Sequence, residues 1–191
     1  MRDGLSKQEL REAIRHQRSG LESAWCEAQS VVVLERLLAL PSVAGAAVVG
    51  LYLALPGEVD ISGLMAVVLS AGRGVCIPAY HAVSGVYAMA EVGPSTRYVD
   101  SRFGLREPID PVWADLSTLE CVVVPGVAFD RGGRRVGHGG GHYDHMLAGI
   151  AARKVGVAFD FQLFDRVPAE AHDVQMDLVI TQTQTCGLNG A

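Results

Sequence analysis

Apolar residues near the start of the chain recur at the spacing of an amphipathic helix. Ser6 and Glu9 form a capping-box pattern, which predicts that a helix begins there. The basic and acidic residues that follow are typical of a solvated surface, with Leu10 and Ile14 facing the core. We expect this helix to continue to Arg18.

Apolar runs that end at turn residues predict most of the remaining elements. Further helices are expected over about 21–40, 59–70 and 143–152. Strands are expected over 46–55, 75–78, 86–90, 121–124, 154–159 and 178–181. In the second helix, the helical spacing of Trp25, Ala28 and Val32 indicates a packing face. Residues 93–115 are expected to be rich in loops, because prolines interrupt the pattern.

The order of these elements predicts an α/β fold. Helical and strand patterns alternate along the chain, as they do where helices cover a parallel sheet. We expect a single-domain open, mainly parallel sheet flanked by helices, formed by residues 1–191. The length suits one domain, and the 49% hydrophobic content can fill a sizeable core.

The segment after the predicted strand 121–124 carries the most distinctive chemistry. The β-branched run ends at Pro125 and Gly126, and a loop with Gly137, Gly139, Gly140 and Gly141 follows further on. Positions without a β-carbon let backbone amides close around an anion, and Asp144 then supplies a hard oxygen ligand suited to Mg²⁺. Three cations stand just upstream: Arg131, Arg134 and Arg135. A glycine-rich loop alone is usually a plain turn, but this combination predicts a site for phosphate and metal.

Three known glycine motifs do not fit this loop. A Walker A loop needs a Gly-Lys pair, which the chain lacks, and the Rossmann fingerprint has another spacing and an earlier position. His138 to Gly141 match the HGGG sequence of esterases, but the GxSxG motif of their nucleophile is missing. In open α/β sheets ligands bind beyond the carboxyl ends of strands, where Glu58 and Asp160 are also expected. We interpret Asp160 as structural.

Charge and hydropathy exclude several classes of protein. The net charge of −5 argues against broad nucleic-acid binding, so the partners are expected to be small molecules. No apolar run is long enough to cross a membrane and the N-terminus is charged, so we expect a cytoplasmic protein without a signal peptide. The four cysteines lack the CxxC spacing of a zinc ribbon or redox pair. A monomer or a small homo-oligomer is expected.

Several ordered motifs accompany the glycine loop. They are Lys7-Gln8-Glu9-Leu10-Arg11, the Tyr52–Glu58 segment, Phe103–Pro108 with its Phe-Gly-x-x-Glu-Pro sequence, the block from Pro125 to Asp144, and the pair Asp173 and Asp177. Together they cover most of the chain. In this order they resemble the 5-formyltetrahydrofolate cyclo-ligase family, also called 5,10-methenyltetrahydrofolate synthetase.

The resemblance implies ATP-dependent cyclisation of 5-formyltetrahydrofolate to 5,10-methenyltetrahydrofolate, with release of ADP and phosphate. The γ-phosphoryl group would pass to the formyl oxygen, which is otherwise a poor leaving group, and nitrogen 10 would then attack the activated carbon. Such phosphoryl transfer depends on positioning and charge neutralisation. The implied cofactors are ATP and Mg²⁺. The implied substrate is a folate with or without a polyglutamate tail.

The resemblance also assigns roles to residues at matching positions. The nucleotide would contact Lys7, Arg11, Arg135, Gly137, His138, Gly139, Gly140, Gly141, His142 and Tyr143. The folate would contact Leu53, Glu58 and Tyr143, and the metal would contact Asp144 and Asp173. Among these residues, Lys7, Arg135 and Tyr143 are expected to act in catalysis.

Without the resemblance, some of these residues have simpler interpretations. Lys7 and Arg11 would lie on a solvated helical face, Glu58 would cap a helix start, and Tyr143 would belong to the core. A module that binds nucleotide or folate without turnover is one functional alternative.

The loop also departs from the family pattern. Some members carry a basic residue at the position of Gly140, and His142 and His145 here flank the Tyr-Asp pair. Imidazoles suit transition metals, so His138, His142 and His145 with Asp144 form the second alternative, a transition-metal site.

Overall fold

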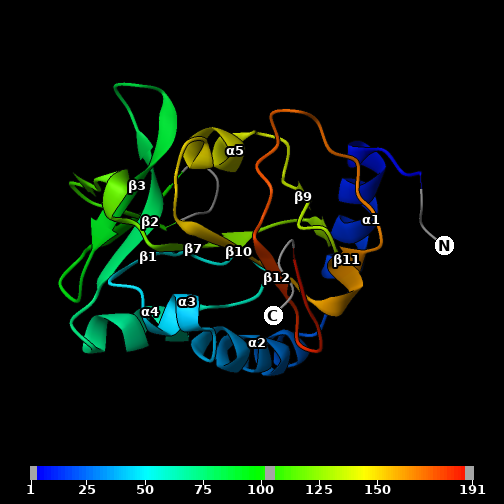
Figure 1. Ribbon diagram of the computed structural model, residues 1–191, viewed down its shortest axis with the longest axis horizontal. Helices are drawn as coiled ribbons and strands as arrows, with labels where there is room; N and C mark the ends of the chain where they lie inside the picture. The colour runs from blue at the N-terminus through cyan, green and yellow to red at the C-terminus, as the bar shows by residue number, and fades with distance from the viewer. Residues whose placement is uncertain (1–3, 102–105, 188–191) are drawn as a thin grey trace.

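A central sheet of eight strands organises the computed structural model, which describes residues 4–101 and 106–187 (Figure 1). From one edge to the other, its strands are β13 (Thr185–Gly187), β12 (Leu178–Ile180), β10 (Arg153–Val157), β7 (Cys121–Pro125), β1 (Val48–Gly50), β2 (Gly74–His81), β3 (Val86–Val92) and β6 (Val112–Trp113). The five strands from β12 to β2 are mutually parallel, and the three outer strands are antiparallel to their neighbours. The predicted α/β class with a mainly parallel sheet is confirmed.

Helices cover both faces of the sheet. They are α1 (Lys7–Ser19), α2 (Ser23–Leu38), α3 (Pro41–Ala44), α4 (Ser62–Ser70) and α5 (His142–Leu147), with short 3₁₀ turns at Leu116–Thr118 and Asp160–Gln162. In Figure 1, α2, α3 and α4 lie below the sheet and α5 lies above it. Helix α1 instead packs on a smaller sheet of β11 (Leu163–Phe164), β8 (Ala128–Asp130) and β9 (Arg135–Val136).

The start of α1 agrees with its sequence pattern. The Ser6 hydroxyl accepts a hydrogen bond from the Glu9 amide at 3.2 Å, and the Glu9 carboxylate accepts one from the Ser6 amide at 2.8 Å. Leu10 is buried against Ala128 and Val136 of the smaller sheet, and Ile14 is fully buried. The predicted capping box and the inward face of this helix are confirmed.

The predicted packing face of α2 is wrong in part. Ala28 and Val32 are exposed, and Trp25 is only half-buried against Phe159, with ring centroids 5.0 Å apart. The fully buried positions are Ser30, Val33 and Leu37. Apolar residues stand on several sides of this helix, so spacing alone did not identify the side that meets the sheet.

Several predicted boundaries also differ. The apolar run 46–55 forms a strand only over Val48–Gly50, and Leu51 and Tyr52 are buried in a loop. The following helix therefore begins at Ser62 rather than at residue 59. The helix predicted over 143–152 ends at Leu147, where Gly149 at φ +80° follows.

Short strands were not foreseen. Residues 93–115 were expected to be loops but contain β4 (Tyr98–Asp100), β5 (Arg106–Pro108) and β6. The smaller sheet and β13 were missed as well, because strands of two or three residues show no usable periodicity. Phe103 and Gly104 of the predicted family motif lie outside the described residues.

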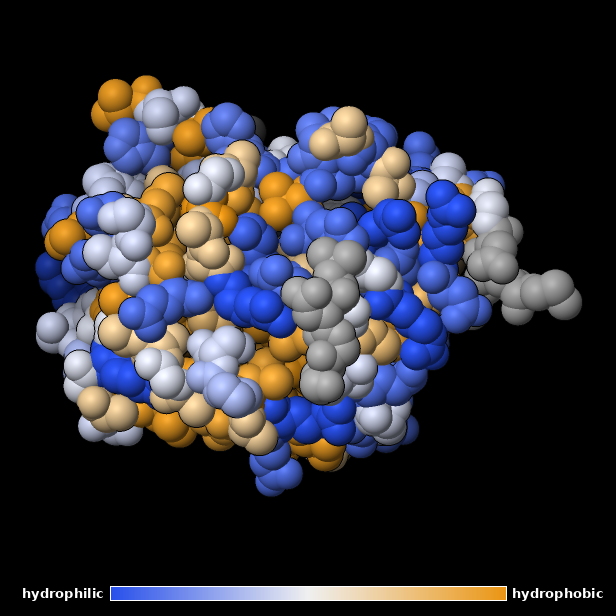
Figure 2. Space-filling model, in the orientation of Figure 1, coloured by the Kyte–Doolittle hydropathy of each residue, from blue (hydrophilic) through white to orange (hydrophobic). Residues whose placement is uncertain are grey.

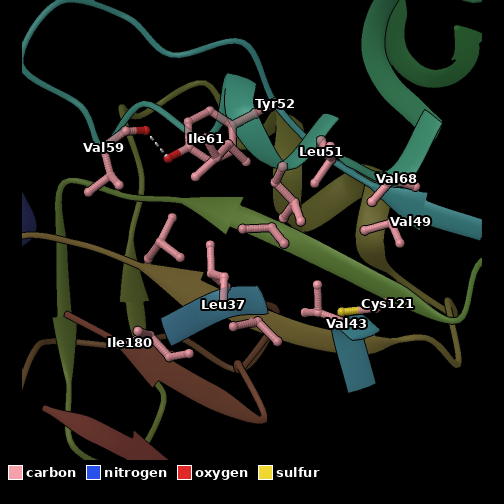
Figure 3. Packing of buried hydrophobic residues seen from close by; sticks show 14 of the residues in the cluster. Leu37, Val43, Val49, Leu51, Tyr52, Val59, Ile61, Val68, Cys121 and Ile180 are labelled. Carbon is pink, nitrogen blue, oxygen red and sulfur yellow. Dashed lines mark hydrogen bonds between the residues drawn. The ribbon is translucent and has the colours of Figure 1, made fainter. Parts of the chain in front are cut away.

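The main core fills the space between the sheet and α2, α3 and α4. Figure 3 shows part of it, including Leu37, Val43, Val49, Leu51, Tyr52, Val59, Ile61, Val68, Cys121 and Ile180. The hydroxyl of Tyr52 donates a 2.5 Å hydrogen bond to the Val59 carbonyl, which ties the loop after β1 to this core. Burial of each large side chain contributes about 1.5–3 kcal/mol, so the cluster holds this loop at the carboxyl end of the strand.

Exposed large apolar side chains, such as Val83 and Val112, are spread over several elements of the described chain. On the face in Figure 2, hydrophilic and hydrophobic residues are interspersed. Within the described residues, no helix combines the length and apolar character needed to cross a bilayer.

Candidate active site

A cavity of about 1010 Å³ opens at the carboxyl ends of β1 and β7. Its walls come from the first turns of α1, the loop after β1, the glycine loop with the start of α5, the segment 168–173, and single residues of β2, β3 and β5. Sequence elements far apart thus meet at one edge of the sheet, where open α/β folds bind ligands. The volume is at the upper end of the range for small-molecule sites.

All residues that the sequence assigned to nucleotide, folate or metal line this cavity: Lys7, Arg11, Leu53, Glu58, Arg135, Gly137, His138, Gly139, Gly140, Gly141, His142, Tyr143, Asp144 and Asp173. Other candidates lie elsewhere. Arg131 pairs with Asp165, and Arg134 pairs with Asp130. Of the three arginines upstream of the glycine loop, only Arg135 lines the cavity.

Asp160 has the structural role that its sequence context suggested. Its carboxylate accepts hydrogen bonds from the hydroxyls of Thr181 and Thr183, so it joins the turn after β10 to the turn after β12.

The glycine loop adopts backbone conformations that favour glycine. Gly139 and Gly141 have φ values of +108° and +65°, in the left-handed region. A β-carbon at Gly137 would lie 2.8 Å from Nη1 of Arg135. The Nε of Arg11 donates a 2.8 Å hydrogen bond to the Gly137 carbonyl, so α1 holds the loop in place.

Two cations of the site are paired with the two candidate metal ligands. Nζ of Lys7 lies 2.7 Å and 2.9 Å from the two carboxylate oxygens of Asp173. Nη2 of Arg135 donates a 2.9 Å bond to Oδ1 of Asp144. Burial alone would raise the pKa of Asp173, but the hydrogen bonds from Lys7 and from the Glu170 amide outweigh it and lower that pKa.

Glu58 is a buried carboxylate at the centre of a polar cluster in the cavity. Only 4% of its side chain is exposed, and Oε1 lies 2.9 Å from Nε2 of His138 and 3.5 Å from Nη1 of Arg18. The amide of Leu55 donates to Oε2 at 3.1 Å. The simpler interpretation of Glu58 as a cap is wrong, because its carboxylate contacts no amide of α4, which begins at Ser62.

Arg18 is a site residue that the sequence did not reveal. Its Nη2 donates a 2.8 Å bond to the Gly126 carbonyl while Nη1 faces Glu58. Burial lowers the pKa of Arg18, and the nearby Glu58 partly offsets that effect. The only sequence signal was its place one turn after Ile14 on the inward side of the helix.

Tyr143 is half-buried beside these groups. The guanidinium of Arg135 lies over its ring, 5.5 Å from the centroid. Burial raises the pKa of Tyr143 strongly, the charge of Glu58 adds to the rise, and Arg135 opposes it. The phenol therefore stays protonated at neutral pH, so it can donate a hydrogen bond but cannot act as a base.

The loop histidines do not assemble a metal centre. His138 is bonded to Glu58, and the ring of His142 packs on Tyr87 with centroids 4.9 Å apart. Across residues 4–101 and 106–187, no group of three or more His, Cys, Asp or Glu side chains is arranged around a common point. The predicted transition-metal alternative thus finds no support in the geometry.

Known proteins resemble this chain over nearly its whole length. The sequence model of the 5-formyltetrahydrofolate cyclo-ligase family matches residues 3–182. The 5-formyltetrahydrofolate cyclo-ligases of Mycolicibacterium smegmatis and Escherichia coli K12 are 34% and 31% identical, covering 92% and 90% of this chain and 93% and 97% of their own. The NMR structure of an Aquifex aeolicus 5,10-methenyltetrahydrofolate synthetase, 33% identical, superposes with a TM-score of 0.84 over 97% of this chain and 94% of that one. The chain belongs to the 5-formyltetrahydrofolate cyclo-ligase family.

Proposed function

We propose that this protein catalyses the ATP-dependent cyclisation of 5-formyltetrahydrofolate to 5,10-methenyltetrahydrofolate. The observation that carries the proposal is the convergence on one cavity of every residue that the sequence assigned to nucleotide, folate or metal, although those residues span positions 7 to 173. Two cyclo-ligases share about a third of the sequence, and a methenyltetrahydrofolate synthetase of known structure shares the fold as well.

The phosphates of ATP would lie against the glycine loop. Backbone amides of Gly137 to Gly141 would surround them, and Lys7 and Arg135 would neutralise charge during phosphoryl transfer to the formyl oxygen. Nitrogen 10 would then attack the formyl carbon and release its proton to solvent, and the bond from that carbon to the phosphorylated oxygen would break as phosphate leaves. Because Lys7 is paired with Asp173 in the free protein, it must exchange that partner for phosphate oxygens.

The folate would bind next to Glu58. A buried carboxylate held by three donors is well suited to orient the polar edge of a heterocycle, and Leu53 supplies an apolar contact nearby. Tyr143 borders the same cavity as a neutral hydrogen-bond donor. The two substrates would thus share one cavity, with Tyr143 assigned to both.

The donor set also fits magnesium that arrives with ATP. Oδ2 of Asp144 makes no hydrogen bond to any described residue, and Asp173 would become available once Lys7 contacts phosphate. Magnesium usually takes one or two protein carboxylates, with phosphate and water as its other ligands. Bound there, it would neutralise charge on the phosphate oxygens.

A spectroscopic assay tests the proposal. Purified protein, 5-formyltetrahydrofolate and magnesium-ATP should give the near-ultraviolet absorbance of the methenyl product, and omission of ATP or magnesium should remove it. Asp144→Asn should abolish turnover, whereas Asp165→Asn, at an exposed carboxylate outside the cavity, should not. A folded wild-type protein that binds both substrates without product would instead support the non-catalytic alternative.

The cytoplasmic location, the oligomeric state and the use of polyglutamate tails stay predictions.

A further inference from the structure

Four basic side chains line the cavity: Lys7, Arg11, Arg106 and Arg135. Three of them donate to carboxylates or a carbonyl of the site already described. Arg106 differs, because its guanidinium makes neither an ion pair nor a hydrogen bond with any residue in the described part of the chain. A cation at a ligand cavity without a protein acceptor is suited to bind an anion of the ligand.

The position of Arg106 in its hairpin strengthens this argument. Strand β5 pairs with β4 so that Arg106 stands opposite Asp100, yet the two side chains form no ion pair. The guanidinium lies instead over the ring of Tyr98, 5.0 Å from its centroid. Stacking on an aromatic ring uses the face of the guanidinium and leaves its N–H edges available for a planar anion.

The next residue fixes this part of β5 against the main sheet. The carboxylate of Glu107 accepts hydrogen bonds from the Tyr80 amide and from the Tyr87 hydroxyl, each at 3.2 Å. Tyr87 itself lines the cavity, and burial with the neighbouring Glu107 raises its pKa to about 12. The strand that carries Arg106 is thus anchored to the cavity wall by a neutral tyrosine.

We propose that Arg106 binds a carboxylate of the glutamate at the far end of the folate substrate. This assignment rests on the proposed function, in which the substrate carries such a tail. Arginine matches a carboxylate with two parallel hydrogen bonds. Phosphates of ATP are the other anions in the reaction, but Arg106 comes from β5, whereas the phosphate and metal candidates come from α1, the glycine loop, α5 and the segment 168–173.

The tail contact can be measured by comparing substrates with and without glutamate. Arg106→Gln should raise KM for 5-formyltetrahydrofolate about tenfold, the size of one charge-assisted contact. It should leave kcat and KM for ATP unchanged, and it should not alter kcat/KM for 5-formyltetrahydropteroate, which lacks the glutamate. Arg97→Gln is the matched control, since Arg97 is exposed near the same hairpin but does not line the cavity.

Calorimetric binding without ATP separates this inference from the proposed reaction. Tenfold weaker binding of 5-formyltetrahydrofolate to Arg106→Gln, with wild-type binding of the truncated analogue, would support the tail contact even if no turnover occurred. Equal losses for both ligands would show that Arg106 only supports the hairpin. A selective rise in KM for ATP would assign it to the nucleotide, and equal affinity of the wild type for both ligands would also overturn the assignment.

Discussion

Nε2 of His138 lies 2.9 Å from Oε1 of Glu58, which joins the middle of the glycine loop to the loop after β1. The two partners differ in burial, because 53% of the His138 side chain is exposed and only 4% of the Glu58 side chain is. Glu58 also has Arg18 and the Leu55 amide as donors. A substrate group that reaches Glu58 from the cavity can therefore replace the imidazole without leaving the carboxylate unpaired.

Glu58→Gln should impair both folate use and stability. Loss of the charge weakens a charge-assisted contact to the heterocycle, so kcat/KM for 5-formyltetrahydrofolate should fall about 10- to 100-fold. It also leaves the largely buried Arg18 without a counter-charge, which should cost about 1–3 kcal/mol of unfolding free energy. Steady-state kinetics and urea unfolding measure the two effects.

His138→Ala is the matched control for that variant. It removes one of three donors, from a half-exposed side chain, so its unfolding free energy should fall by less than about 1 kcal/mol. If it lowered stability as much as Glu58→Gln, the imidazole rather than Arg18 would be the main partner of the carboxylate.

Lys7→Met should mainly damage the use of ATP. The variant removes a cation that we assign to phosphate and leaves Asp173 without its closest partner. We expect kcat/KM for ATP to fall at least about 100-fold, because charge neutralisation is a large part of phosphoryl-transfer catalysis. Arg15→Met, at an exposed position of the same helix outside the main cavity, is the control. Similar ATP kinetics for the two variants would remove Lys7 from the phosphate site.

Gly156→Ala should destabilise the fold through a clash with Phe129. A β-carbon at Gly156 would lie 2.5 Å from Cε1 of this fully buried ring, and one at Gly126 would lie 2.5 Å from its Cζ. With the ring packed between two strands and unable to move away, overpacking should cost about 1–3 kcal/mol in urea unfolding. Gly93→Ala meets no atom within 4 Å and should be nearly neutral.

A second substitution at Phe129 tests whether the clash with its ring causes the loss of stability in Gly156→Ala. Adding Phe129→Leu to Gly156→Ala should give a total loss smaller than the sum of the single losses, because the smaller side chain relieves the clash. Strict additivity would mean that Gly156→Ala acts through the backbone instead.

The sequence identified the cavity residues better than the elements that carry them. Gly137 to Asp144 form one short segment, so their closeness needs no knowledge of the fold. Arg18 was missed because it meets Glu58 only through tertiary packing, forty positions apart. The predicted strand 46–55 was too long because it included Leu51 and Tyr52. These residues are apolar because they are buried in a loop, not because they belong to a strand.

Tyr52, which is buried, and Tyr143, which is half-buried, should make the protein sensitive to alkali. Burial raises the pKa values of Tyr52 and Tyr143, so above pH about 10 the unfolded chain loses phenolic protons that the folded chain keeps. The contribution of these tyrosines to stability should therefore be constant below that pH and fall above it, by up to about 1.4 kcal/mol per pH unit for each of them. Urea unfolding at pH 8 and pH 11 measures the difference.

Tyr143→Phe tests whether this site residue contributes to that fall. Its hydroxyl makes no hydrogen bond to any described residue, so the variant should match the wild type at pH 8, whereas Tyr52→Phe also loses the bond to the Val59 carbonyl. At pH 11, Tyr143→Phe should be more stable than the wild type. The variant has no phenol at position 143 whose ionisation favours the unfolded chain. Equal losses of stability between pH 8 and pH 11 in the wild type and Tyr143→Phe would mean that the phenol ionises as easily in the cavity as in water, and its assignment as a neutral donor to the substrate would fail.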